Sequence, residues 1–191
     1  LGSVHIETGT YDPGRISRND GGGRDIPGDD GSRADNSADT DLSASGNQPM
    51  VSANERYIIT FNGEIYNFQS LREELKGKGY TFNNHTDTEV LLALYEHLGP
   101  KMLDKINGMF AFALHDARKR KLFLVRDHIG IKPLYYSFSK DYIVWGSEIK
   151  ALLVSGLVER QLDVDSLGDF LAWEYIPGEG TLFRNVRKLE P

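Results

Sequence analysis

The chain has 191 residues, enough to bury one substantial core, and its hydrophobic (39%), aromatic (10%) and charged (26%) fractions are typical of globular proteins. Its net charge of −6 argues against a broad nucleic-acid surface, which needs clustered Lys and Arg. No apolar stretch approaches the roughly 20 residues of a membrane helix, and no signal peptide is visible at the start. The five histidines lack metal-ligand spacing, so we expect no metal site.

Two regions of different composition meet near residue 47. Residues 1–46 are rich in Gly, Asp, Ser, Asn and Arg and hold almost no large apolar side chains. Such a stretch cannot bury enough apolar surface to offset the entropy lost on ordering, so we expect residues 1–46 to be disordered. Residues 47–191 alternate apolar runs with amphipathic segments, which predicts one folded domain.

The first half of that domain reads as a strand and three helices. Residues 56–61 form a β-rich run that stops at Asn62-Gly63, a turn signal. Apolar residues at helical spacing predict a helix over residues 68–75. Thr86, with Glu89 three residues later, resembles a capping box and opens a helix that we expect to reach residue 98. A Gly-Pro pair then ends it and starts a short third helix.

The second half reads as two hairpins followed by helices. Residues 109–115 and 121–126 are apolar runs joined by a charged turn, and residues 133–138 and 142–146 form a second such pair. We expect helices over residues 148–154 and 164–175 and an extended, loop-like tail after them. Hairpins mixed with helices predict an α+β fold, with antiparallel sheets covered by helices, rather than a βαβ nucleotide-binding fold.

Five short motifs occur in this order: FNGEIYN at 61–67, HTDTE at 85–89, GMFAFA at 108–113, RDHIGIKPLYY at 126–136 and SEIKAL at 147–152. Any one of them alone would be a weak signal. Together, over roughly residues 41–191, they resemble the class II glutamine amidotransferase domain of the glutamine-hydrolysing asparagine synthetases.

That resemblance implies both a fold and a function. The fold is an N-terminal-nucleophile (Ntn) hydrolase-like αββα sandwich, in which two antiparallel sheets lie between helix layers. The function is glutamine hydrolysis in the cytoplasm, which supplies ammonia for the ATP-dependent amidation of aspartate. The implied partners are glutamine and a synthetase domain in cis; a homodimer is also open. This domain itself would need no cofactor, because ATP and Mg²⁺ are expected only in the synthetase domain.

The resemblance also assigns the site residues. Asn62 and Gly63 correspond to the donors that stabilise the tetrahedral oxyanion of glutamine hydrolysis. Glu64 and Asp87 correspond to the carboxylates that hold the α-ammonium group of the substrate. Without the other motifs, Asn62-Gly63 would be read as a plain turn and Asp87 as a helix-start residue. Arg126 and Asp127 are interpreted as fixing a turn rather than as catalytic.

The chain departs from the family at its start. The family's nucleophile is a cysteine at position one, whereas this chain begins with Leu1 and Gly2 and contains no cysteine. The Arg that grips the glutamine carboxylate falls near Asn36, where a Gly-Asp-Ser-rich stretch shows no strand character. We therefore expect the first strands to be missing or replaced and the chain to be inactive in hydrolysis.

Three hypotheses remain open from the sequence. The chain is a fragment or defective copy of an asparagine synthetase-like enzyme, a non-catalytic module that binds glutamine or a partner, or an amidotransferase for another acceptor, such as a sugar or peptide carboxylate. The first is favoured because the matched segment reads as cut at both ends.

Overall fold

The computed structural model describes residues 3–7 and 47–191. The expected disorder of residues 8–46 lies outside these ranges. For residues 3–7 the expectation is wrong, because this stretch forms strand β1 (Ser3–Glu7), paired antiparallel with Lys121–Val125. An early strand of the fold is therefore present, although the composition around it gave no reason to expect one.

Two antiparallel sheets make up the strand content. The first has five strands in the order β1-β5-β4-β3-β2, where β2 is Met50–Val51, β3 is Tyr57–Ile65, β4 is Gly108–Asp116 and β5 is Lys121–Arg126. The second has three strands in the order β7-β6-β8, where β6 is Tyr135–Phe138, β7 is Ile143–Gly146 and β8 is Arg187–Lys188. The two hairpins expected from the apolar runs are β4–β5 and β6–β7.

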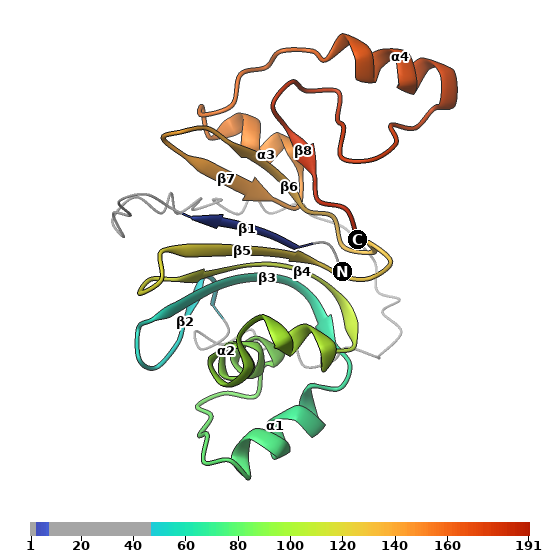
Figure 1. Cartoon of the computed structure of the whole chain (residues 1–191). Helices are drawn as coiled ribbons and strands as arrows, with labels where there is room; N and C mark the ends of the chain where they lie inside the picture. The colour runs from blue at the N-terminus through green and yellow to red at the C-terminus, as the bar shows by residue number, and fades with distance from the viewer. Residues whose placement is uncertain (1–2, 8–46) are drawn as a thin grey trace, which may run out of the picture.

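The helices lie on the outer sides of the sheets (Figure 1). They are α1 (Phe68–Lys76), α2 (Asp87–Leu98), the 3₁₀ helix η3 (Gly99–Asp104), α3 (Ile149–Val154) and α4 (Val164–Trp173). Helix α2 covers the outer face of the first sheet and α1 packs against α2, while the second sheet faces the other side of the first, with α3 beyond it. The α+β expectation with two antiparallel sheets is confirmed.

Three apolar clusters correspond to the three contacts between these layers. The largest joins the first sheet to α1, α2 and η3, and includes Ile59, Phe110 and Leu91. A second lies between the sheets around Leu124 and Tyr136. The third packs Leu152 of α3 against the second sheet. Because side chains alternate along a strand, Phe110 and Phe112 face the helices while Ala111 and Ala113 face the second sheet.

Three strand predictions need correction. β3 does not stop at Asn62-Gly63 but runs on to Ile65, paired residue by residue with β4. The tail, expected to be wholly loop-like, contains β8, which pairs with Tyr135 and Tyr136 of β6. β2 was not expected either, and it has only two residues. Strands this short carry too few residues for a periodic pattern, so only their partner strands reveal them.

The loop from β5 to β6 links the two sheets and is organised by Arg126 and Asp127. The Arg126 guanidinium donates to the carbonyl oxygens of Lys132, Gly130 and Leu189 at 2.6–2.7 Å. The Asp127 carboxylate accepts four backbone N–H groups at 3.0–3.2 Å, from residues 110, 129, 131 and 132. Both side chains are buried. This matches the interpretation of the two residues as turn-fixing.

We expect Asp127→Asn to lower the free energy of unfolding at pH 7 by about 2–3 kcal/mol, because one carboxylate oxygen becomes an amide that faces buried N–H donors. Burial by itself raises the pKa of Asp127. The hydrogen bonds from its four N–H partners lower that pKa by more than burial raises it, so the pKa lies below its ordinary value. The carboxylate's contribution is therefore complete above the unfolded pKa, near 3.9, and is lost as the pH falls through the lower folded pKa.

Urea denaturation of both proteins at pH 7 and at progressively lower pH measures this. The gap between wild type and variant should narrow on acidification below the unfolded pKa. Asp141→Asn is the matched control, since that side chain is 75% exposed in a hairpin turn, and it should change stability by less than about 0.5 kcal/mol. Equal effects of the two substitutions would contradict the assignment.

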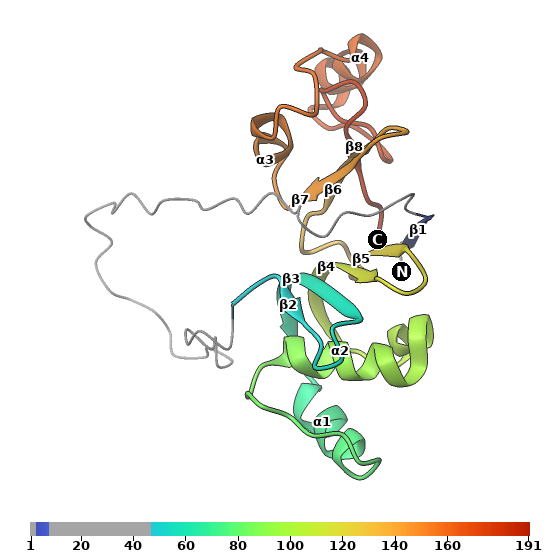
Figure 2. The same ribbon diagram turned by 90° about the vertical axis from the view of Figure 1, so that its left-hand side faces the viewer.

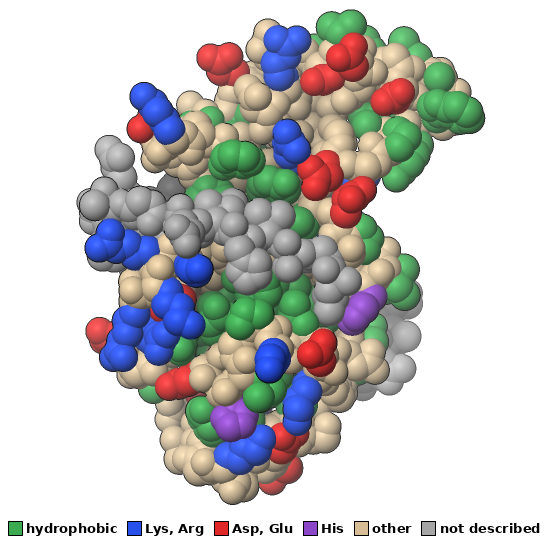
Figure 3. Space-filling view, in the orientation of Figure 1, with side chains coloured by type: hydrophobic (Ala, Val, Ile, Leu, Met, Phe, Trp, Pro, Cys, Tyr) green, Lys and Arg blue, Asp and Glu red, His purple; other side chains and the backbone are tan. Residues whose placement is uncertain are grey.

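Two surface features stand out. Residues 117–120, the charged turn between β4 and β5, are exposed, and Lys and Arg side chains gather on that side of the molecule (Figure 3). Helix α4 has no buried residue. It lies beyond the second sheet, at the end of the molecule opposite α1 (Figure 2), and has hydrophobic side chains on its surface (Figure 3). Within the described residues, no helix has the length and apolarity needed to cross a membrane.

Candidate amidotransferase site

β3 carries three of the four predicted site residues. Because successive side chains of a strand point to opposite faces of the sheet, the buried residues of β3 show which face each site residue is on. Ile59 and Ile65 are buried and belong to the cluster on the helix side. Thr60, Asn62 and Glu64 therefore point to the opposite face, toward the second sheet. Sheet register places Ala111 opposite Asn62 and Ala113 opposite Thr60. Small side chains at these positions leave open space between the two sheets.

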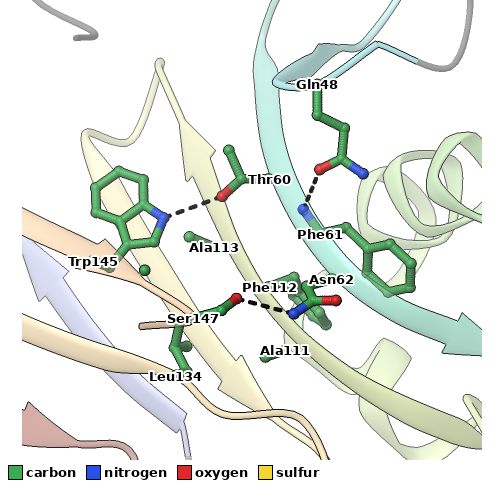
Figure 4. Close-up of a pocket in the computed structure, with 11 residues that line it drawn as sticks. Gln48, Thr60, Phe61, Asn62, Ala111, Phe112, Ala113, Leu134, Trp145 and Ser147 are labelled. Carbon is green, nitrogen blue, oxygen red and sulfur yellow. Dashed lines mark hydrogen bonds between the residues drawn. The ribbon is translucent and has the colours of Figure 1, made fainter. Parts of the chain in front are cut away.

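That space is a groove of about 230 Å³ (Figure 4). It is lined by Gln48, Thr60, Phe61, Asn62, Ala111, Phe112, Ala113, Leu134, Trp145, Gly146 and Ser147. Two hydrogen bonds cross it: Trp145 Nε1 donates to Thr60 Oγ1 at 3.1 Å, and Asn62 Nδ2 donates to Ser147 Oγ at 3.0 Å. The groove is thus lined only by neutral polar groups and apolar side chains.

The edge of β3 away from β4 holds backbone donors. The N–H of Phe61 donates to Gln48 Oε1, and the N–H of Ile65 donates to Asp87 Oδ2 at 3.0 Å. N–H groups of alternate strand residues point to the same side. The N–H of Gly63, midway between them, is therefore directed to this same edge. Asp87 and the Gly63 N–H thus share one edge of β3, next to the face that carries Asn62.

Gly63 is required at its position because β3 and β4 approach closely. A Cβ there would lie 2.2 Å from the Met109 oxygen and 2.6 Å from the Phe110 Cα, and the φ of Gly63 is +152°. The space at Gly108 is equally small, since a Cβ added there would lie 2.1 Å from the Glu64 backbone oxygen. Only glycine fits these approaches. They explain why an Asn-Gly pair continues a strand here instead of forming a turn.

Asp87 is placed by the start of α2. Thr86 is the N-cap, and its hydroxyl accepts the N–H of Glu89 at 3.2 Å. The reciprocal half of the expected capping box is absent, because the Glu89 carboxylate instead accepts the N–H groups of Asn83 and Asn84. Burial raises the pKa of Asp87, against hydrogen bonds from Ile65 and Thr88 that lower it. A cation beside this carboxylate would offset that desolvation.

The structure places the four predicted residues along one end of β3, but only one of them lines the groove. Asn62 lines the groove, while Gly63 and Glu64 follow it directly along β3 and Asp87 joins the strand through Ile65. Gly63, Glu64 and Asp87 do not line the groove itself. The position expected for the carboxylate-gripping Arg, near residue 36, lies outside the described residues. No cluster of metal-ligating side chains occurs in the described part of the chain.

Sequence reasoning missed several groove residues. Trp145 and Gln48 lie outside the five motifs, and Ser147 lies inside SEIKAL, where the resemblance assigns it no role. The one signal for Ser147 was its place in a motif, because its contact with Asn62 joins residues 85 apart in the sequence.

Comparison with known proteins gives consistent matches. The family model described as the glutamine amidotransferase domain matches residues 36–191. Glutamine-hydrolysing asparagine synthetase 1 of Bacillus subtilis (strain 168) is 44% identical over 146 residues, which cover 76% of this chain and 23% of that protein. Asparagine synthetase B of Escherichia coli (strain K12) is 45% identical over 109 residues, 56% of this chain and 20% of that protein.

Among solved structures, the glutamine phosphoribosylpyrophosphate amidotransferase of B. subtilis, complexed with ADP and GMP, aligns with a TM-score of 0.48 and 27% identity. That alignment covers 60% of this chain and 28% of that one. The chain spans about a quarter of the length of the curated relatives that it matches. From the family match over residues 36–191, the chain belongs to the glutamine amidotransferase domain family, and it is homologous to the asparagine synthetases.

Proposed function

We propose that residues 47–191 are the glutamine-binding part of an asparagine synthetase-like amidotransferase with an Ntn hydrolase-like αββα fold. One observation supports the proposal: Asn62 lines the groove, Gly63 follows it on β3, and the Asp87 carboxylate accepts the N–H of Ile65, two residues further along the same strand. In this proposal Asn62 and Gly63 donate to the side-chain oxygen of glutamine. Glu64 and Asp87 hold its α-ammonium group.

The chemistry of each group supports its role. A side-chain amide and a backbone N–H preset on a sheet edge can stabilise an oxyanion without reorganising. A carboxylate–ammonium hydrogen bond is worth roughly 1.5–3 kcal/mol, which separates an amino acid from a plain amide. The raised pKa of Asp87 fits a carboxylate whose environment is completed by a cation.

The relatives support the wider reaction. Both curated relatives named above are glutamine-hydrolysing asparagine synthetases, and the matched region is 23% of one and 20% of the other. We propose that the domain works in cis with a synthetase domain, which holds the ATP and Mg²⁺ and amidates aspartate. The absence of cysteine from the chain favours a second candidate for this polypeptide alone, a module that binds glutamine without hydrolysing it.

Calorimetric titration with L-glutamine tests the binding site. We expect weak binding, and Glu64→Gln or Asp87→Asn should each weaken it by roughly ten- to a hundredfold, beyond calorimetric detection. Affinity should fall as the pH drops through the raised pKa of Asp87, because only the ionised carboxylate attracts the ammonium group.

The control for these variants is Glu73→Gln, which also removes one negative charge but from an exposed surface pair with Lys76. It should bind glutamine as the wild type does. Equal loss in all three variants would indicate a general charge effect, and full binding by the Asp87 variant would remove that residue from the site.

A further inference from the structure

Ser147 is the partner that fixes the Asn62 side chain. Asn62 is exposed on β3, and its Nδ2 donates to Ser147 Oγ at 3.0 Å (Figure 4). Ser147 directly follows β7, and α3 starts two residues later. That junction is held firmly, because Leu152 of α3 is fully buried and lies close to Gly146, where a Cβ would stand 3.2 Å from it. Ser147 is thus a fixed acceptor on the far side of the groove.

A fixed acceptor changes what the Asn62 amide can do. Its nitrogen carries two hydrogens, so the one given to Ser147 leaves the other to donate to a ligand. An exposed Asn without a partner would sample several rotamers, and ordering it on binding would cost affinity. A donor already held in place avoids that cost.

We propose that Ser147 is a positioning residue, which holds the Asn62 carboxamide ready to recognise the side-chain oxygen of glutamine. This inference rests on the proposed function, because it takes Asn62 as a ligand-contacting donor. It also adds a specificity: Ser147 serves recognition of the ligand's carboxamide end and has no part in holding its α-amino end.

A purely structural role for Ser147, tying the two sheets together, makes a different prediction. The Trp145–Thr60 hydrogen bond ties β7 to β3 at 3.1 Å, two residues along each chain segment from the Ser147–Asn62 bond, and does not involve Asn62. Trp145→Phe removes that bond while keeping an aromatic ring, so it is the matched control. If bridging the sheets were all that mattered, Trp145→Phe and Ser147→Ala would have similar effects.

The binding experiment compares L-glutamine with L-norvaline, which has a methyl group in place of the carboxamide. We expect Ser147→Ala to weaken glutamine binding about three- to tenfold, the loss of one hydrogen bond, and to leave norvaline binding unchanged. Ser147→Thr keeps the hydroxyl and should bind like the wild type. Trp145→Phe should not alter the ratio of the two affinities, and in an Asn62→Ala background Ser147→Ala should have no further effect. Equal weakening for both ligands in Ser147→Ala would overturn the proposal.

A second readout needs no ligand. In NMR spectra of the free protein, the side-chain amide signals of Asn62 should shift and become more mobile on the ps–ns timescale in Ser147→Ala, but not in Trp145→Phe or Ser147→Thr. If the wild type binds no glutamine, the proposed function fails, while these signals still decide whether Ser147 holds Asn62. Unchanged Asn62 signals in Ser147→Ala would refute the positioning role.

Discussion

We expect this 191-residue chain to release ammonia from glutamine about 10⁶-fold more slowly than a family member that carries the cysteine nucleophile, the usual cost of losing a nucleophile. The chain has no cysteine. The groove offers two hydroxyls as substitutes, but Thr60 accepts a hydrogen bond from Trp145 and Ser147 accepts one from Asn62. Of the described residues lining the groove, none is a His, Lys, Asp or Glu that could act as a base.

An ammonia assay coupled to glutamate dehydrogenase measures this rate, with asparagine synthetase B of E. coli as the positive control under the same conditions. The chain should give no signal above the uncatalysed background, even where titration shows that glutamine is bound. Turnover in the ordinary enzyme range, about 1–10³ s⁻¹, would contradict the prediction and point to a nucleophile elsewhere in the chain. Binding without turnover would separate the glutamine-binding role from the hydrolytic one.

Much of the fold was predictable because it rests on local signals. The hairpins β4–β5 and β6–β7 follow from apolar runs separated by charged or polar turns, and Thr86 marks the start of α2. What failed depended on partners distant in sequence. Asn62-Gly63 carries a strong local turn signal, yet pairing with β4 carries β3 through it to Ile65. β1 sits beside β5, more than a hundred residues away, and its surrounding composition hides it.

The candidate site divides in the same way. Asn62, Gly63, Glu64 and Asp87 could be named from motifs, because three are adjacent in sequence and the fourth opens a helix. The sequence could not show that Asp87 reaches the N–H of Ile65, since that contact depends on how α2 packs against the sheet. It also could not pair Ser147 with Asn62, because these residues meet only when the second sheet closes over the first.

We expect Gly63→Ala to destabilise the domain by at least about 3 kcal/mol, enough to leave much of it unfolded. The new methyl group would lie 2.2 Å from the Met109 oxygen and 2.6 Å from the Phe110 Cα. Both are backbone atoms of the adjacent central strand, so no side chain can turn away to make room. A φ of +152° adds strain that an L-residue with a Cβ rarely tolerates.

Gly168→Ala is the matched control, because Gly168 lies inside exposed α4 and a Cβ there meets nothing within 4 Å. It should raise stability by about 0.5–1 kcal/mol, the helix preference of Ala over Gly. Urea denaturation followed by circular dichroism compares the three proteins, and the loss of a cooperative transition in Gly63→Ala counts as the expected result. A midpoint equal to that of the wild type would mean that β3 and β4 do not approach as closely as described. The Gly63 N–H would then have no fixed position on the edge of the sheet. The argument that it donates to the oxyanion would no longer hold.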